Sequence, residues 1–280
     1  MKNIIKHIVS ITVIILPYVN FAQTNFYKAS WEDVVLKAKT ENKLIFVDLY
    51  FTGCFPCAQM DKTIFPNEKV SQLLNQDFVA FKSDIFKEDI GKRLARKYGV
   101  TGFPSFVILD SKGNTIDVNS GFKSVEELLS LLNAAKERFK TKDFKSYSKA
   151  LNIDYPEFYS DAYLKNKRKV SFEVVDSYLK SQKDLNAEIP FVIITGLRIG
   201  GEYVDYVISH ADKLAKAYGR IPVRNYLSGM VNVKAKHFGT ENNQKEFENL
   251  LKQVKPIFTT NEWDKFGSDF KKTFEKNKQL

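Results

Sequence analysis

The first half of the chain alternates between two hydrophobic periods, and this alternation predicts an α/β domain. Apolar residues recur every three to four positions in the segments expected to be helical, and they form short continuous runs in the segments expected to be buried strands. The expected elements, in order, are a helix at 31–40 capped by Ser30, a strand at 44–51, a helix at 56–75, a strand at 78–83, a helix at 88–98, strands at 105–109 and 115–119, and a helix that Ser124 caps and that reaches about residue 139.

From residue 143 onward strand signals nearly vanish, and the pattern predicts an array of seven or eight helices. Four of them are expected at 171–185, 203–218, 223–238 and 243–258. A last helix at 261–276 places four aromatic residues on one face, a spacing typical of core packing: Trp263, Phe266, Phe270 and Phe274. No clear repeat period emerges, so helical hairpin repeats stay one open arrangement. Residues 140–142 are the expected linker between a domain at 23–140 and a helical domain at 141–280.

The first 22 residues have the pattern of a cleaved secretory signal. Lys2 and Lys6 precede an apolar run of 12 residues at 8–19. That run is shorter than the roughly 20 residues that a membrane-spanning helix needs. The longest later apolar stretch, 189–199, is interrupted by a proline, a glycine and an arginine. We therefore expect an exported, periplasmic chain without stable membrane insertion, and an uncleaved helix is the alternative.

Composition and charge narrow the choice of function. With 44% hydrophobic and 27% charged residues among 280, the chain is typical of a globular protein. The formal net charge is +10, and the basic residues are dispersed among acidic ones. This pattern indicates a solvated surface, so no nucleic-acid partner is expected. Only two cysteines are present, which excludes a scaffold held by several disulfides.

The two cysteines, Cys54 and Cys57, directly follow an expected buried strand and open the next helix. Their spacing places both sulfurs at the amino end of that helix, where unpaired N–H groups and the helix dipole favour a thiolate. Pro56 suits the first helical turn because it gives up no hydrogen bond there. The pair therefore indicates thiol chemistry.

Residues 44–119 resemble thioredoxin, and the lead-in at 51–53 with its long following helix is similar to periplasmic disulfide-reductase domains. The resemblance implies a thioredoxin fold for residues 23–140, a mixed sheet flanked by helices. It also implies that Cys54 is the nucleophile and Cys57 the resolving cysteine. Gly53 stands where the family usually has tryptophan, and Phe55 where it usually has glycine, so Phe55 is expected to supply the aromatic surface for substrate.

Three further positions match the family. Asp48 lies inside the expected first strand, where an acid is unusual, and the resemblance implies that it relays the proton of Cys57. Pro104 matches the family's cis proline, whose neighbour Phe103 would pair through its backbone with an extended substrate. Lys82 resembles the family's lysine near the buried acid and is included as a candidate catalytic residue. Phe103, Pro104, Phe55 and Pro56 form the expected substrate surface.

The resemblance implies a protein-disulfide reductase acting outside the cytosol, with oxidase and isomerase as the other forms of the same chemistry. Protein or peptide disulfides would be its clients, and a transmembrane electron donor would reduce it again. The Cys54–Cys57 disulfide is the redox group, and no other cofactor is expected.

The sequence leaves three functions other than an enzyme to weigh: a zinc site, a copper-binding thiol pair and an adaptor. Structural zinc needs four ligands, and neither a second cysteine pair nor a nearby histidine is present, since His210 and His237 lie in the helical half as ordinary helix residues. Two thiolates could instead capture copper transiently. The chain could also be an adaptor that binds a partner through its helical half without catalysis.

Overall fold

The structure is a computed structural model, and it describes residues 23–278. The signal peptide expected at residues 1–22 lies outside the described residues. No helix among residues 23–278 is both long and apolar enough to cross a membrane.

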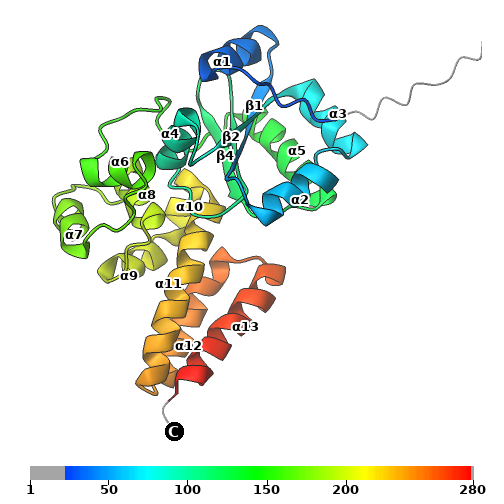
Figure 1. The fold of residues 1–280 in the computed structure, drawn as a ribbon. Helices are drawn as coiled ribbons and strands as arrows, with labels where there is room; N and C mark the ends of the chain where they lie inside the picture. The colour runs from blue at the N-terminus through cyan, green and yellow to red at the C-terminus, as the bar shows by residue number, and fades with distance from the viewer. Residues whose placement is uncertain (1–22, 279–280) are drawn as a thin grey trace, which may run out of the picture.

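A mixed four-stranded sheet lies at the centre of the first half (Figure 1). Its strand order is β2-β1-β3-β4. β1 pairs in parallel with β2 and antiparallel with β3, and β3 pairs antiparallel with β4. The strands are β1 at Leu44–Tyr50, β2 at Phe78–Asp84, β3 at Ser105–Leu109 and β4 at Thr115–Ser120. This arrangement confirms the fold class expected from the alternating pattern.

Helices cover both faces of the sheet. Buried side chains of α2, α3 and α5 form one apolar cluster with alternate strand residues such as Leu44 and Phe46. The residues between them, such as Ile45 and Val47, join a second cluster with α1, α4 and the helical half. The helices are α1 at Trp31–Thr40, α2 at Phe55–Thr63, α3 at Glu68–Asp77, α4 at Asp89–Lys97 and α5 at Val125–Thr141. Successive side chains of a strand point to opposite faces, so β1 contributes to both cores.

The single helix expected at 56–75 is wrong, because the chain forms two helices, α2 and α3, with a break between them. Asn67 caps α3 by accepting hydrogen bonds from Lys69 and Val70. Pro66, just before it, has no N–H to continue a helix. Phe65 turns inward at the break and packs edge-on against Phe26. Capping and the burial of one aromatic ring therefore decide where the first helix ends.

Residues 143–278, all described, form eight α-helices, one 3-10 helix and no strand, which confirms the expected helical region. Helix α11 leads from the sheet-bearing half into a group with α12 and α13 that projects from it (Figure 1). Phe270 and Phe274 are fully buried, as expected of a packing face. The elements are α6 at Glu157–Leu164, α7 at Phe172–Lys180, α8 at Glu188–Gly196, α9 at Glu202–Ser209, α10 at Ala211–Tyr218, α11 at Arg220–Thr240, α12 at Gln244–Val254, η1 at Lys255–Ile257 and α13 at Thr260–Asn277.

Several expected boundaries differ from the structure. The segment 203–218 is two helices that meet at His210, whose backbone leaves the helical region. The helix expected at 171–185 ends at Lys180, and the one expected at 243–258 ends at Val254, just before Pro256. Lys140 and Thr141, placed in the expected linker, form the last turn of α5, which ends where Lys142 adopts a left-handed conformation.

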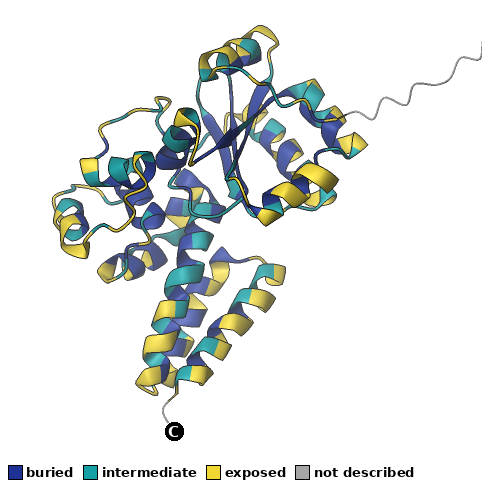
Figure 2. Cartoon of the chain, viewed as in Figure 1, coloured by how far each residue is buried: buried dark blue, intermediate teal, exposed yellow. Residues whose placement is uncertain are grey.

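The helical half packs directly onto the sheet-bearing half. One continuous apolar cluster contains residues of both, and the elements at their junction are largely buried (Figure 2). Lys97 of α4 is completely buried and pairs with Glu188 of α8 at 3.2 Å. Tyr159 of α6 donates a hydrogen bond of 2.6 Å to the carbonyl of Arg96. These contacts hold the two halves in one arrangement.

The buried Lys97–Glu188 pair leads to a stability prediction. Glu188→Ala should lower the free energy of unfolding by about 3 kcal/mol, because the buried ammonium of Lys97 loses its carboxylate partner. Glu137→Ala is the matched control, since Glu137 and its partner Lys140 are more than half exposed, and a loss of about 0.5 kcal/mol or less is expected. Urea titration of both variants measures the difference, and equal losses would contradict the docking role of the pair.

Candidate active site

Cys54 and Cys57 form a disulfide at the amino end of α2. Cys54 is the residue that caps the helix, and its sulfur accepts a hydrogen bond of 3.3 Å from the N–H of Cys57. Pro56 lies in the first turn, which carries no acidic residue. The unpaired N–H groups of this turn favour negative charge on a sulfur. The strand-to-helix junction thus places both sulfurs where a thiolate is stabilised.

The turn before Cys54 is anchored by a residue that sequence reasoning missed. Asp84, at the end of β2, accepts hydrogen bonds from the N–H and the hydroxyl of Thr52, at 2.8 and 2.7 Å. Gly53 follows with a φ of 95°, a conformation that glycine adopts without strain. The glycine at this position is therefore explained by the backbone turn. The only sequence signal for Asp84 was an acid at the end of a buried strand.

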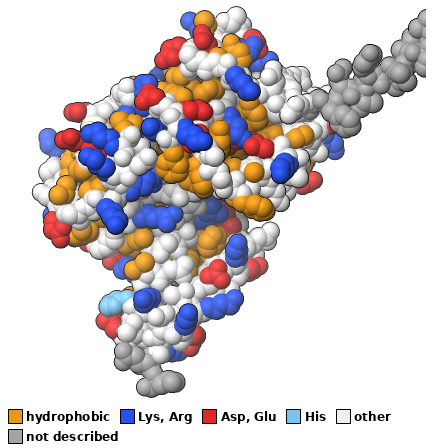
Figure 3. All heavy atoms as spheres, viewed as in Figure 1, with side chains coloured by type: hydrophobic (Ala, Val, Ile, Leu, Met, Phe, Trp, Pro, Cys, Tyr) orange, Lys and Arg blue, Asp and Glu red, His pale blue; other side chains and the backbone are white. Residues whose placement is uncertain are grey.

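An apolar rim surrounds the disulfide. Cys54 and Cys57 are only 4% and 2% exposed, whereas the Phe55 side chain between them is 79% exposed. The ring of Phe51 contacts the rings of Phe103 and Phe86, with centroids 4.9 and 5.8 Å apart. On the face shown in Figure 3, hydrophobic side chains gather over the sheet-bearing half with charged ones scattered among them. Phe55, between the two cysteines, is thus the exposed aromatic side chain nearest to them in the sequence.

Residues 98–104, which connect α4 to β3 and are called the Pro104 loop, lie at the same end of the sheet as the cysteines. Ser105 at the start of β3 pairs with Leu49 near the end of β1, so the residues before β3 lie beside those after β1. The Phe103–Pro104 peptide bond is cis. The carbonyl of Pro104 accepts a hydrogen bond of 2.8 Å from the N–H of Gly121, the residue after β4. Gly121 and its half-exposed neighbour Phe122 therefore border the same loop, and no sequence motif had pointed to them.

Asp48 is buried in the middle of β1, on the face that α2 covers. It shares this face with Leu44 and Phe46, which belong to the same apolar cluster as Met60 of α2. Its side chain is 1% exposed, and neither carboxylate oxygen accepts a hydrogen bond. Burial raises the pKa of Asp48 to about 6, and the nearby charge of Lys82 limits this rise. A carboxyl with this pKa can take up or release a proton near neutral pH.

Lys82 on β2 lies between Asp48 and an open pocket. Its ammonium lies 3.3 Å from a carboxylate oxygen of Asp48 and also pairs with Asp61 of α2. Burial acts to lower the pKa of Lys82, but the two carboxylates outweigh it and raise the pKa above its ordinary value. Lys82 and Asp61 line an open pocket of about 590 Å³, with aromatic walls that include Tyr50. Asp61 was missed by sequence reasoning, although it lies one helical turn after Cys57.

His210 and His237, the histidines of residues 23–278, take no part in this arrangement. His210 stacks on Tyr206 at 4.1 Å, at the boundary of α9 and α10, and His237 lies exposed on α11 beside Glu241. Among residues 23–278, no three His, Cys, Asp or Glu side chains are grouped closely enough to hold a metal ion.

The buried carboxyl predicts a change in stability with pH. Asp48→Asn should raise the free energy of unfolding at pH 7 by about 2 to 3 kcal/mol. The pKa of Asp48 is about 6 in the folded protein against an ordinary value of 3.8. The folded state therefore holds the proton more tightly, and ionisation destabilises it as the pH rises through this window. Urea titrations at about pH 4 and pH 7 measure the effect.

The control for this variant is Asp264→Asn, which changes an exposed carboxylate of α13 and should leave stability unchanged at both pH values. If Asp48→Asn stabilised the protein equally at pH 4 and pH 7, the raised pKa would be refuted.

Comparison with known proteins agrees with this geometry. A family model described as a thioredoxin-like domain matches residues 31–136. The thiol:disulfide interchange protein DsbD of Colwellia psychrerythraea is 30% identical over 102 residues, which are 35% of this chain and 17% of that protein. Spermatogenesis-associated protein 20 of Homo sapiens is 42% identical over 48 residues, 17% of this chain and 6% of that one. The chain thus spans less than a fifth of the length of these curated relatives.

Among solved structures, a proposed disulphide-isomerase from Bacteroides thetaiotaomicron is 30% identical, with 41% of this chain and 94% of that chain covered and a TM-score of 0.39. A thioredoxin from Thermus thermophilus is 24% identical, with 40% and 88% covered and a TM-score of 0.37. The family match ends at residue 136, before the first helix of the helical half. Residues 31–136 of this chain are therefore a thioredoxin-like domain.

Proposed function

We propose that this protein is a thiol–disulfide oxidoreductase that reduces protein or peptide disulfides outside the cytosol. The observation that carries the proposal is the Cys54–Cys57 disulfide at the amino end of α2, next to the Pro104 loop and on the helix that covers the buried Asp48. DsbD, a relative over about a third of this chain, is named for thiol:disulfide interchange. The expected signal at residues 1–22 supports export to the periplasm.

In the first step the Cys54 thiolate attacks one sulfur of a client disulfide. A mixed disulfide forms between Cys54 and that sulfur, and the other client sulfur leaves as a thiolate. Cys54 caps the helix, and its sulfur accepts a hydrogen bond from the N–H of Cys57. We therefore assign Cys54 as the nucleophile. The exposed Phe55 and the Phe103–Pro104 backbone would contact the client segment beside it.

In the second step Cys57 resolves the mixed disulfide. Asp48 takes the proton of the Cys57 thiol, directly or through water, and the resulting thiolate attacks the Cys54 sulfur. The second client sulfur leaves, the Cys54–Cys57 disulfide closes, and the client has gained two electrons. Asp48 can return the proton towards solvent past Lys82 and Asp61, whose pocket is open. A dithiol of a transmembrane electron donor would then reduce the protein again, so no bound cofactor is required.

The assay that tests this proposal is the reduction of insulin disulfides with dithiothreitol as the electron source. The wild-type protein should accelerate the reaction, and Cys54→Ala should abolish the acceleration because the attacking thiolate is gone. His237→Ala, a change on the exposed face of α11, should retain full activity. If wild type were no faster than Cys54→Ala, the chain would be a non-catalytic adaptor and the proposal would fail.

Client disulfides should be trapped by a second variant. In Cys57→Ser the mixed disulfide on Cys54 cannot be resolved, so covalent complexes should accumulate in the periplasmic fraction of intact cells after an acid quench. Non-reducing gels followed by mass spectrometry identify the partners. The double variant Cys54→Ser/Cys57→Ser is the control and should yield none. Complexes confined to the cytosolic fraction would contradict the proposed location, and their absence everywhere would contradict a client-reducing role.

A further inference from the structure

The Pro104 loop has the disulfide on one side and the helical half on the other. On the side of the disulfide, Phe103 packs against Phe51. On the other side, Tyr163 of α6 donates to the carbonyl of Val100, and Arg198, after α8, donates to the carbonyl of Thr101, each at 3.4 Å. The helical half therefore contacts the backbone that leads into the expected client-binding loop.

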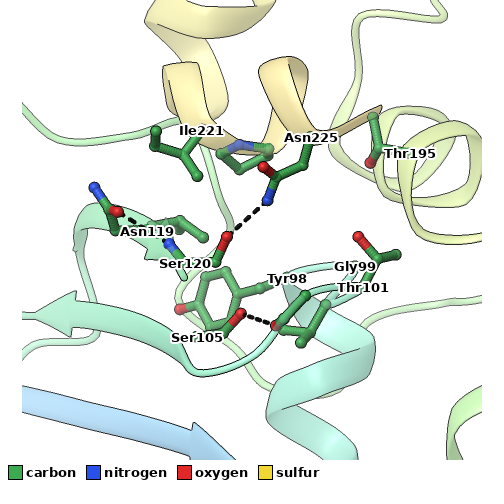
Figure 4. A pocket seen from close by; sticks show the side chains of 13 residues that line it. Tyr98, Gly99, Thr101, Ser105, Asn119, Ser120, Thr195, Ile221 and Asn225 are labelled. Carbon is green, nitrogen blue, oxygen red and sulfur yellow. Dashed lines mark hydrogen bonds between the residues drawn. The ribbon is translucent and has the colours of Figure 1, made fainter. Parts of the chain in front are cut away.

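A chain of hydrogen bonds reaches from α11 to Pro104. Figure 4 shows Asn225 of α11 pointing at Ser120, to whose hydroxyl it donates a hydrogen bond of 2.7 Å. Ser120 is followed by Gly121, whose N–H donates to the carbonyl of Pro104 at 2.8 Å. Ser120 is also opposite Ser105 in the β3–β4 register. Asn225 is thus hydrogen-bonded to the end of β4, and the residue after β4 is hydrogen-bonded to Pro104.

The Asn225–Ser120 pair also lies close to the loop at Gly102. The hydroxyl of Ser105 donates to the carbonyl of Gly102 at 2.7 Å. A Cβ atom at Gly102 would lie 3.7 Å from the Ser120 hydroxyl and 3.8 Å from the Asn225 amide nitrogen. Asn225, Ser120 and the loop therefore meet at one point, which Figure 4 shows from close by.

The contact between the loop and the helical half is direct. The pocket between them has a volume of about 20 Å³, room for about one water molecule. At Gly99 the backbone approach is close, because a Cβ on Gly196 of α8 would lie 3.0 Å from the Gly99 Cα. The buried Lys97–Glu188 pair fixes α4 and α8 relative to each other just before this loop. The backbone at Gly99 is therefore in direct contact with α8.

We propose that the helical half is part of the redox site, and that Asn225 is a positioning residue that holds the Pro104 loop in its client-binding geometry. This inference rests on the proposed function. Asn225 touches no reacting atom and acts through Ser120, Gly121 and the Pro104 carbonyl. A loop that pairs with an extended client through its backbone binds best when it is already ordered, because ordering then costs no further entropy on binding. A small disulfide without a peptide backbone does not use this pairing.

The experiment compares Asn225→Ala with Asn232→Ala in the full chain. Asn232 is the matched control because it is also a half-buried asparagine of α11, but its partners are Ser228 and Thr273 of the helical half. KM and kcat are measured with insulin and with a small aryl disulfide, together with the reduction potential and Tm. Asn225→Ala should raise KM for insulin about fivefold, the factor for loss of its hydrogen bond to Ser120, worth about 1 kcal/mol. Its kcat with the small disulfide and its potential should equal those of wild type.

Two further variants keep the test decisive. Asn225→Asp should restore the insulin KM, because an aspartate can accept a hydrogen bond from the Ser120 hydroxyl. Arg198→Ala removes an exposed side chain that donates to Thr101. It should fold even where Asn225→Ala does not, and it should raise the insulin KM about twofold.

The inference is overturned if Asn225→Ala matches Asn232→Ala, if insulin and the small disulfide are affected equally, or if Arg198→Ala leaves the insulin KM unchanged. If wild type itself is no faster than Cys54→Ala on either disulfide, the proposed function fails instead. The two failures are therefore distinguishable.

Discussion

The burial of one carboxyl group beneath the cysteine-bearing helix is the constraint around which the site is built. Asp48 occupies an apolar sheet face where a leucine or valine would stabilise the core, and its oxygens accept no hydrogen bond. Such a group destabilises the folded state, and groups of this kind concentrate at sites where protons are transferred. The cation beside it, Lys82, also pairs with Asp61. The arrangement leaves Asp48 able to change protonation rather than locked in one charge state.

The two faces of the sheet pack against different parts of the chain. One face packs α2, α3 and α5 and holds the disulfide and Asp48. The other packs α1, α4 and the whole docked helical half. The loops at the ends of the strands lie where the two faces meet, so the Pro104 loop can contact Phe51 on one side and α11 on the other through Ser120. The sheet thereby connects the strand ends beside the disulfide with the helical half.

The packing of the helical half against the sheet-bearing half distinguishes one folded unit from two flexibly linked modules. An adaptor module joined by a flexible linker would share few buried contacts with its neighbour. Here a completely buried lysine and one continuous apolar core join the two halves, and the segment after Lys142 runs back along the sheet, where Lys145 donates to the carbonyl of Thr115. The arrangement is that of one folded unit, in which the two halves share a core.

Local signals in the sequence determined the element types, the cap at Ser30, the cysteine pair at a strand-to-helix junction and the helical character of residues 143–278, because each depends on neighbours within a few positions. Only the tertiary structure decided four other features: the break at Pro66, the pairing of Lys82 with Asp61, the anchoring of Thr52 by Asp84 and the approach of Asn225 to Ser120. Asn225 and Ser120 are 105 positions apart. Hydrophobic periodicity indicates which face of a helix or strand is buried, but not which other element that face packs against or at what angle. Contacts between polar side chains that are distant in sequence therefore depend on how the elements pack.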